Sequence, residues 1–329
     1  MTANAKLLPA KEEQGYSLLD AGGALSHAVI AQSRAQFAAV GALHIANTGI
    51  ADRDAMQEAL PAFGFGATEQ FSAGGRTASD WQAKWAVHGL RNLDYYPPNL
   101  YLLPNGEIHY QRDFPSRILF FCNTPPATGG RTFLHSAKKI ERAIAGSGAE
   151  GRALLEKITA HGVMIETGFL DEGHPLKKQN YHQSWQERFG TADKAAALAA
   201  AQSRTREYDS CWWQEQDGSP VLMTRITLPG FFRDIRDGEH YLRLPRIAAD
   251  GPVAKNGYRR FPLGNGAEMT GKEKNLLRAA YEATREGFTW QHGDIVLMDN
   301  IRYGHSREPF TGPREVLLGM AGLLRIEKN

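Results

Sequence analysis

The C-terminal part of the chain concentrates residue types that bind metals and anions. Within Trp290–Met320 a strand-like run ends at Asp299-Asn300, His305 follows after a short turn, and Arg314 opens another strand-like run. Histidine is the commonest metal ligand in proteins, and arginine binds carboxylates through two parallel hydrogen bonds. A histidine at one strand edge and an arginine near the start of the next can converge in one pocket. The spacing therefore indicates a metal ligand beside a carboxylate clamp.

The elements that must position these side chains can be predicted from residue propensities and turn signals. Strand-like runs lie in the middle and at the C-terminal end of the chain, and helical patterns flank them. The sequence does not show a strict alternation of strands and helices with a glycine-rich dinucleotide-binding motif. This pattern favours a mostly β chain with an antiparallel core decorated by helices. We expect one domain over residues 1–329, with a helical insertion at about 137–214. The expected helices are Ser26–Val40, Ala137–Ala145, Gly151–Ala160, Asp193–Gln202 (capped by Thr191) and Gly271–Glu286, and the expected strands are Leu100–Leu103, Ile118–Cys122, Val221–Thr227, Asp294–Asp299 and Val316–Leu324.

Composition excludes several classes of protein. The 329 residues are 42% hydrophobic and 22% charged, which is typical of a globular chain and not of a disordered or fibrous one. The net charge of +2 gives no basic field that would favour nucleic acid or an anionic membrane. Two cysteines, Cys122 and Cys211, lie in different surroundings and are expected to be reduced.

The C-terminal motif resembles a known family. The motif begins with Asp299-Asn300 and, after four further residues, continues as H-S-R-E-P-F-T-G-P-R from His305 to Arg314. It resembles the closing motif of the taurine dioxygenase-like Fe(II)/2-oxoglutarate oxygenases. It is most similar to the branch that contains syringomycin-type hydroxylases and clavaminate synthase-like enzymes. Three other segments match the same branch in order along the chain. They are Pro115–Thr132 with its G-G-x-T pattern, Ser184–Thr191 with the following Trp213 and Asp217-Gly218, and Gly264–Glu268.

The resemblance implies a fold, two cofactors and several site residues. The fold would be a double-stranded β-helix, or jelly roll, with the metal at its mouth. Fe(II) would be bound by two histidines and one carboxylate, a set that leaves positions open for 2-oxoglutarate, the co-substrate, and for oxygen. By resemblance, His305 is the second imidazole ligand, Thr132 binds the co-substrate, and Arg314 holds the distal carboxylate of 2-oxoglutarate.

The sequence departs from the family at the first metal-binding motif. Counting back eight residues from Pro115 gives Glu107, and the family pattern His-x-Glu is here Asn105-Gly106-Glu107. Asn105 could bind iron through its amide oxygen. Alternatively His109, two residues beyond Glu107, would share its strand face and restore two histidines and one carboxylate. The third hypothesis is that the site binds no iron.

The function implied by the resemblance is oxidation of a small organic acid, an amino acid or a carrier-bound acyl group in specialised metabolism. Glu107 argues against halogenation, because the halogenases of this superfamily lose the carboxylate. One alternative is a catalytically degenerate oxygenase-fold protein that acts as a binding or partner subunit. Another is a metal-independent lyase or isomerase with Glu107 as general base and His305 as acid.

The expected partner is a small-molecule substrate, either free or carrier-bound, and no nucleic acid or membrane. A homo-oligomer and a pairing with another oxygenase subunit both stay open. The first residues lack the apolar core of a signal peptide, and no window approaches the ~18 apolar residues of a membrane span. We therefore expect a cytoplasmic protein.

Overall fold

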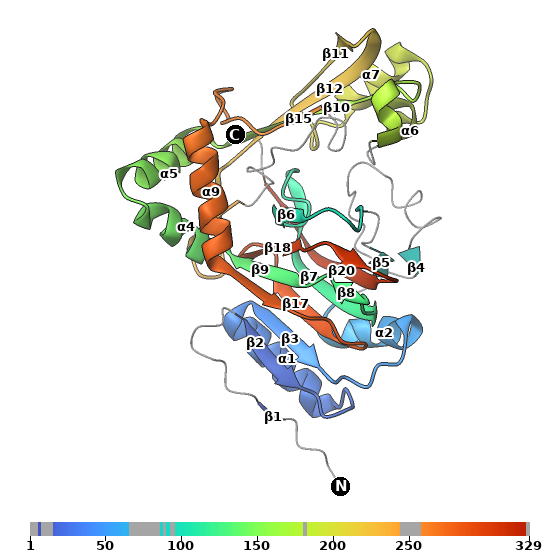
Figure 1. The fold of residues 1–329 in the computed structure, drawn as a ribbon, viewed down its shortest axis with the longest axis vertical. Coiled ribbons are helices and arrows are strands. Elements are labelled where there is room, and N and C mark those ends of the chain that lie inside the picture. The colour runs from blue at the N-terminus through green and yellow to red at the C-terminus, as the bar shows by residue number, and fades with distance from the viewer. Residues whose placement is uncertain are drawn as a thin grey trace. The chain divides into compact units, whose positions relative to one another are not determined.

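The structure is a computed structural model, and it describes residues 6–7, 16–65, 86–87, 90–92, 96–179, 183–243 and 258–326 (Figure 1). The chain divides into two compact units. Unit 1 comprises Met1–Glu107, Phe114–Lys139 and Thr284–Leu324. Unit 2 comprises Ile108–Asp113, Ile140–Ala283 and Arg325–Asn329.

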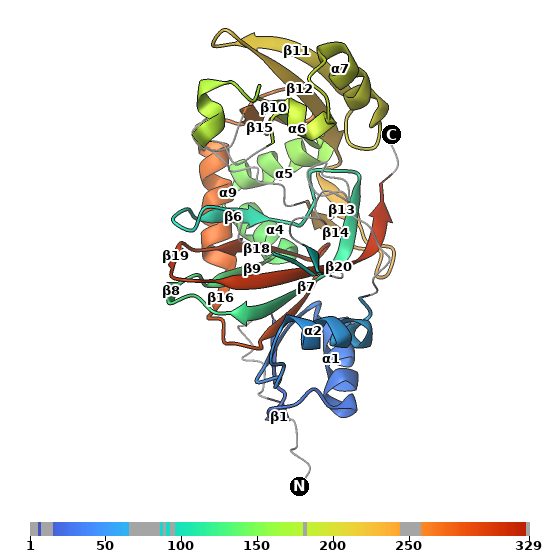
Figure 2. The same ribbon diagram turned by 90° about the vertical axis from the view of Figure 1, so that its right-hand side faces the viewer.

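Unit 1 is built on two main β-sheets (Figure 2). Among the strands of unit 1 that the structure describes, the pairs with a defined register are antiparallel, except for the parallel pair β2–β3. The larger sheet has eight strands in the order β1 (Lys6–Leu7), β2 (Ser17–Asp20), β3 (Ala42–Ala46), β17 (Ile295–Asp299), β7 (Asp113–Thr124), β20 (Glu315–Arg325), β5 (Leu90–Asn92) and β4 (Ala86–Val87). The smaller has four, in the order β16 (Arg285–Phe288), β9 (Thr132–Ser136), β18 (Tyr303–Arg307) and β6 (Leu102–Asn105).

The two sheets of unit 1 pack against each other through aromatic rings. The Phe120 ring of β7 lies 5.1 Å from the His305 ring of β18, and the His44 ring of β3 lies 4.7 Å from the Phe288 ring of β16. Among the strands that the structure describes, the sheets stay separate and do not close into one barrel. A mostly β chain with several helices is therefore confirmed.

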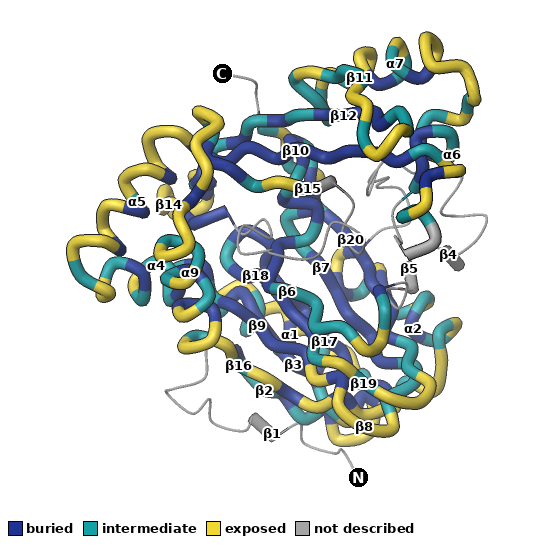
Figure 3. Tube along the Cα trace, turned by 45° about the horizontal axis from the view of Figure 1, so that its top comes forward, coloured by how far each residue is buried: buried dark blue, intermediate teal, exposed yellow. Residues whose placement is uncertain are grey.

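The opposite face of the eight-stranded sheet is covered by helices. Side chains alternate between the two faces of a strand, so Leu119 and Phe121 point away from Phe120. They join a buried core with residues of β3, β17, α1 (His27–Val40) and α2 (Arg53–Ala59), followed by the 3₁₀ turn η1 (Leu60–Phe63). The helix α1 begins where predicted, because the Ser26 side chain accepts a hydrogen bond from the Val29 N–H. Figure 3 shows the inner strands as mostly buried.

Unit 2 contains a four-stranded sheet in the order β11 (Ser210–Gln216), β12 (Ser219–Leu228), β10 (Val163–Phe169) and β15 (Tyr258–Arg260). One face of this sheet is covered by α6 (Trp185–Phe189) and α7 (Lys194–Ser203), which bury Trp185 and Ala197 against Phe169 and Leu222. The other elements of unit 2 are most of α4 (Ala137–Gly146), α5 (Ala149–His161), η2 (Pro175–Gln179), the hairpin β13 (Phe231–Arg233) and β14 (His240–Leu242), and α9 (Gly271–Thr284). None of the described helices has the length and apolar character that crossing a membrane requires.

Several element boundaries differ from the sequence-based expectation. The cap of α7 is Asp193, whose carboxylate accepts from the Ala196 N–H, and not Thr191. The last predicted helix ends at Thr284, because Arg285–Phe288 pair with β9 instead. Residues 137–214 are not helical throughout, since they include β10 and most of β11.

The single-domain organisation stays a prediction. Neither Cys122 nor Cys211 forms a disulfide.

Candidate metal and co-substrate site

Glu107 and His305, far apart in the sequence, lie next to each other in unit 1. The Glu107 Oε2 atom is 3.9 Å from the His305 Nε2 atom. The two side chains are 15% and 6% exposed, so both are largely withdrawn from water. His305 belongs to the fully buried strand β18, and the edge of the Phe120 ring packs against its imidazole at 67°. The structure therefore brings together the two residues that the resemblance named as carboxylate and imidazole ligands.

Asn105 lies on the neighbouring strand, directly opposite His305. The ladder between β6 and β18 pairs the Cα atoms of these two residues, and Asn105 is 8% exposed. Residues directly opposite each other in an antiparallel pair project to the same face, with Cα atoms about 4.5 to 5.5 Å apart. The amide of Asn105 consequently shares a sheet face with the imidazole of His305.

His109 does not lie on a strand with Glu107. β6 ends at Asn105, residues 107–110 form a turn, and Ile108 has a left-handed φ of 58°. The expectation that alternation along one strand places Glu107 and His109 on one face is wrong, because this turn ends the alternation. His109 belongs to unit 2, where its buried ring packs edge-on against Phe232 at 4.9 Å. Its role as a metal ligand stays a prediction.

The donor atoms beside His305 are of types that bind a divalent cation. In an octahedral site, adjacent ligand atoms that each lie about 2.1 Å from the ion are about 3 Å apart. The 3.9 Å between Glu107 Oε2 and His305 Nε2 exceeds this distance, so the two side chains must move closer together to bind one ion as adjacent ligands. Across the described ranges, no group of three or more His, Cys, Asp or Glu side chains could hold a metal. Among the described residues, the amide oxygen of Asn105 is a donor of another type on the same sheet face as His305.

Thr132, the predicted co-substrate ligand, lies on the same sheet face as His305. In the ladder of β9 with β18, Leu134 is opposite His305 and Thr132 is opposite Arg307, so all four side chains project to one side. Thr132 is 5% exposed, and its hydroxyl oxygen accepts a 2.9 Å hydrogen bond from the indole N–H of Trp290. This contact leaves the hydroxyl proton of Thr132 available for an acceptor.

Arg314, the predicted carboxylate clamp, is half-buried and lies one residue before β20. Its guanidinium lies over the Phe310 ring, 5.4 Å from the ring centroid. Stacking on an aromatic face restricts a guanidinium without using its hydrogen-bond donors. The structure therefore gives the Arg314 guanidinium a defined position over the Phe310 ring.

A short ribbon joins the segments that carry Thr132 and Arg314. β8 (Thr128–Gly129) pairs with β19 (Phe310–Thr311), and the Gly130 N–H donates to the Pro309 carbonyl at 3.0 Å. A Cβ atom on Gly129 would lie 2.3 Å from the Pro309 carbonyl oxygen. The glycines of the G-G-R-T pattern are therefore required for the close approach of the two segments.

Arg307 is a buried residue of the site region to which the sequence analysis assigns no role. It is 4% exposed and lies on the same face of β18 as His305. Its Nη2 donates to the carbonyls of Pro97 at 2.8 Å and Leu100 at 3.2 Å, and its guanidinium lies over Phe310 at 4.7 Å. Arg307 thus anchors the chain that leads into β6. Nothing in the residue type alone distinguishes this buried arginine from a solvated one.

A buried polar chain lies on the other face of β18. The Ser306 hydroxyl contacts His135 Nε2 at 2.8 Å and the Tyr101 hydroxyl at 2.9 Å. Burial, together with the nearby charge of Arg285, lowers the pKa of His135 to about 3. His135 is therefore neutral in the folded protein, and it supports β18 from behind.

Solved structures with a similar fold are iron- and 2-oxoglutarate-dependent oxygenases. PvcB from Pseudomonas aeruginosa matches with a TM-score of 0.55 and 16% identity, over 98% of this chain and 94% of PvcB. It is described as an Fe, alpha-ketoglutarate dependent oxygenase from an isonitrile synthetic pathway. A taurine dioxygenase from Burkholderia xenovorans matches with a TM-score of 0.52 and 13% identity, over 99% and 95% of the two chains. The chain therefore shares the fold of these proteins.

Two curated proteins are similar in sequence. A clavaminate synthase-like protein of Arabidopsis thaliana is 24% identical over 227 residues, which are 68% of this chain and 66% of the relative, slightly less than two thirds of its length. The dapdiamide synthesis protein DdaC of Enterobacter agglomerans is 23% identical over 250 residues, 73% of this chain and 71% of DdaC. No protein-family model matches the chain.

Proposed function

We propose that this protein is an Fe(II)- and 2-oxoglutarate-dependent oxygenase. The observation that carries the proposal is the 3.9 Å approach of Glu107 Oε2 to His305 Nε2, with Asn105 opposite His305 in the same sheet. The shared fold and the names of the similar proteins support it. In this proposal the two sheets of unit 1 are the halves of a jelly roll, and residues of about 137–214 are an insertion into it.

The proposed iron ligands are Glu107, His305 and the amide oxygen of Asn105. Bound iron would supply the activation of oxygen, coupled to oxidative decarboxylation of 2-oxoglutarate to succinate and carbon dioxide. Glu107 provides the negative charge, and the neutral imidazole and amide fill two further positions. An amide oxygen is a weaker neutral donor than an imidazole. The substitution at Asn105 therefore lowers the affinity for iron without removing the site.

The protein's own groups would position 2-oxoglutarate. Arg314 offers a planar pair of N–H donors to the distal carboxylate, and the Thr132 hydroxyl donates a further hydrogen bond to it. Trp290 holds the Thr132 oxygen in place through its indole N–H. The ribbon of β8 and β19 keeps the two segments joined. The co-substrate would thus be gripped at its far end, leaving its keto acid end for the metal.

The proposed substrate is a small organic acid, an amino acid or a carrier-bound acyl group. The names of DdaC and PvcB place those proteins in dapdiamide synthesis and in an isonitrile synthetic pathway. A role in the biosynthesis of small molecules is consistent with these names. The pairing of this chain with another oxygenase subunit and its cytoplasmic location stay proposals.

The test is an anaerobic titration of the metal-free protein with Fe(II) and 2-oxoglutarate, followed by admission of oxygen. We expect a weak visible charge-transfer band and then succinate formation, both abolished in Glu107→Ala and His305→Ala. Absence of the band at millimolar iron would favour a non-catalytic partner subunit. Substrate turnover that survives strong chelation without succinate would favour the metal-independent lyase or isomerase.

A further inference from the structure

We propose that Asn300 is a positioning residue that sets the location of Glu107 relative to His305. The inference rests on the proposed function for its metal-binding consequence, but its structural part can be tested without metal. The main chain of Glu107 lies outside any strand. β6 ends at Asn105, and Glu107 opens a turn in which Ile108 takes a left-handed φ. A β-branched residue rarely adopts that conformation, so the turn needs support from its surroundings.

At Glu107 this support includes the side-chain amide of Asn300. The Glu107 N–H donates to Asn300 Oδ1 at 2.8 Å, and Asn300 Nδ2 donates back to the Glu107 carbonyl at 2.8 Å. The same Nδ2 group donates to the Pro115 carbonyl at 2.7 Å. Asn300 is fully buried, so water does not compete for these bonds. Its amide therefore satisfies both polar groups of the Glu107 backbone, as a neighbouring strand would.

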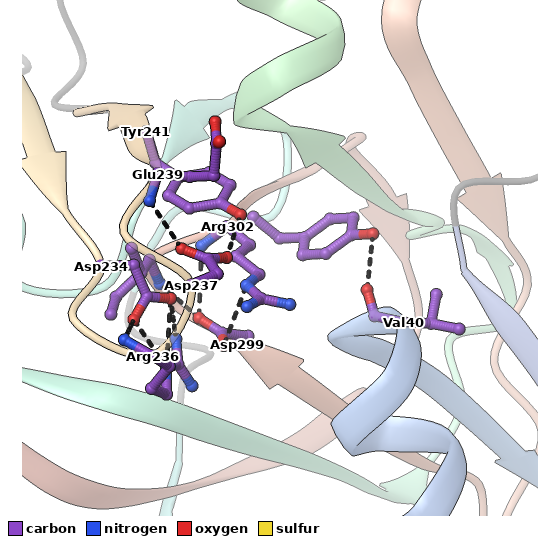
Figure 4. Close-up of polar contacts among 10 residues, drawn as sticks. Val40, Asp234, Arg236, Asp237, Glu239, Tyr241, Asp299 and Arg302 are labelled. Atoms are coloured by element: carbon purple, nitrogen blue, oxygen red, sulfur yellow. Dashed lines mark hydrogen bonds and ion pairs between the residues drawn. The ribbon is translucent and has the colours of Figure 1, made fainter.

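Asn300 is itself held in place by hydrogen bonds, and it lies in the hairpin that carries His305. It lies in the turn between β17 and β18, and its own N–H donates to the Ser116 carbonyl at 2.8 Å. The preceding Asp299 carboxylate accepts from the N–H groups of Ile301 at 2.9 Å and Arg302 at 3.3 Å, which stabilises this turn. Figure 4 shows the Arg302 side chain beside the same carboxylate. One amide thus links the turn of Glu107 to the hairpin of His305.

The chemistry of the contact requires asparagine. Aspartate has the same shape but lacks the two N–H donors, so it would place a carboxylate oxygen against the carbonyls of Glu107 and Pro115. Alanine would remove the bonds that the N–H and C=O of Glu107 make to the Asn300 amide. Both substitutions should release Glu107 from its position while leaving its carboxylate intact.

The first experiment measures amide hydrogen exchange in the metal-free protein. We expect Asn300→Asp and Asn300→Ala to speed the exchange of the Glu107 amide by about tenfold or more, with no comparable change in β20. The control is Asn123→Ala, which removes another side-chain amide of unit 1, one that donates to Glu315. Unchanged exchange at Glu107 in both Asn300 variants would overturn the proposal.

The second experiment measures Mn(II) affinity by calorimetry. We expect Asn300→Ala to weaken Mn(II) binding about tenfold or more, and the control Asn123→Ala, which loses the amide that donates to Glu315, to weaken it by less than about twofold. An equal loss in both variants would mean that Asn300 acts through general stability and would refute the positioning role. If the unchanged protein binds no Mn(II), the proposed function fails, and the exchange experiment alone decides whether Asn300 fixes Glu107.

Discussion

Asn105 and His305 face each other across the ladder between β6 and β18, on the same side of the four-stranded sheet. The relationship places the neutral amide of Asn105 beside the imidazole of His305, on one face of the sheet. Both side chains are mostly buried, and Glu107 approaches His305 from the turn that follows β6. The consequences of this arrangement can be measured.

Replacing Asn105 by histidine should strengthen metal binding. An imidazole at this position would complete two histidines and one carboxylate, the set that non-haem iron oxygenases use. We expect Asn105→His to raise the Mn(II) affinity by about tenfold or more, since even the partners of metal ligands change affinity by about 10- to 100-fold. Calorimetry checks this, with Asn105→Ala expected to weaken binding. Loss of the metal in His109→Ala, with no gain in Asn105→His, would identify His109 as the third ligand.

Removing Arg314 should weaken 2-oxoglutarate binding and leave metal binding unchanged. A charge-assisted pair between arginine and carboxylate contributes about 1.5 to 3 kcal/mol, so the KM for 2-oxoglutarate should rise about 10- to 100-fold in Arg314→Ala. The measurement is succinate formation at fixed Fe(II). Arg131→Ala is the matched control, because Arg131 pairs with Glu308 on the adjacent exposed surface. Equal effects of the two substitutions would contradict a specific role for Arg314.

The ribbon of β8 and β19 should be sensitive to one methyl group. In Gly129→Ala the new Cβ would lie 2.3 Å from the Pro309 carbonyl oxygen, so β8 and β19 must separate. We expect a raised KM for 2-oxoglutarate and a lower Tm. Gly190→Ala is the control, because Gly190 has the same φ of 67° and no atom within 4 Å of its Cβ position. A loss of Tm no larger than in the control would show that the ribbon tolerates the methyl group.

The buried His135 should make stability depend on pH. Its pKa of about 3 in the folded protein lies below the ordinary value of 6.5, so between these values the unfolded chain binds a proton that the folded protein does not. Stability therefore rises with pH across this window, by about 2 kcal/mol between pH 5 and pH 7. Urea unfolding of the protein and of His135→Gln at both values checks this. The variant should lose most of the difference, and an equal slope in both proteins would exclude His135 as the cause.

The parts of the fold that follow from local patterns could be predicted, and the parts that depend on distant partners could not. Ser26 and the strand Ile118–Cys122 are examples of the first kind, because a cap bond and a run of apolar residues are local features. Thr191 and Asp193 can both cap a helix, and only the structure shows that Asp193 does so while Thr191 accepts from the Asp193 N–H. Arg285-Glu286 fit a helical pattern but pair with β9, which is far away in sequence.

The same distinction holds for the candidate site. Two continuous motifs predict Thr132 and the pair His305 and Arg314 as site residues, and these roles stay predictions. Alternation along a strand failed for His109, because residues 107–110 turn at a conformation that Ile108 rarely adopts. The bonds of Asn300 to Glu107 join two segments almost two hundred residues apart, and no local pattern encodes such a contact.

The contact between Trp290 and Thr132 gives the protein an intrinsic optical reporter. Indole emission responds to the hydrogen bond that its N–H makes, and this N–H is bonded to the hydroxyl that would receive the co-substrate. Binding of 2-oxoglutarate at Thr132 can thus be followed by tryptophan fluorescence in a sample that contains neither oxygen nor a substrate. A Trp290→Phe variant gives the background emission of the other five tryptophans.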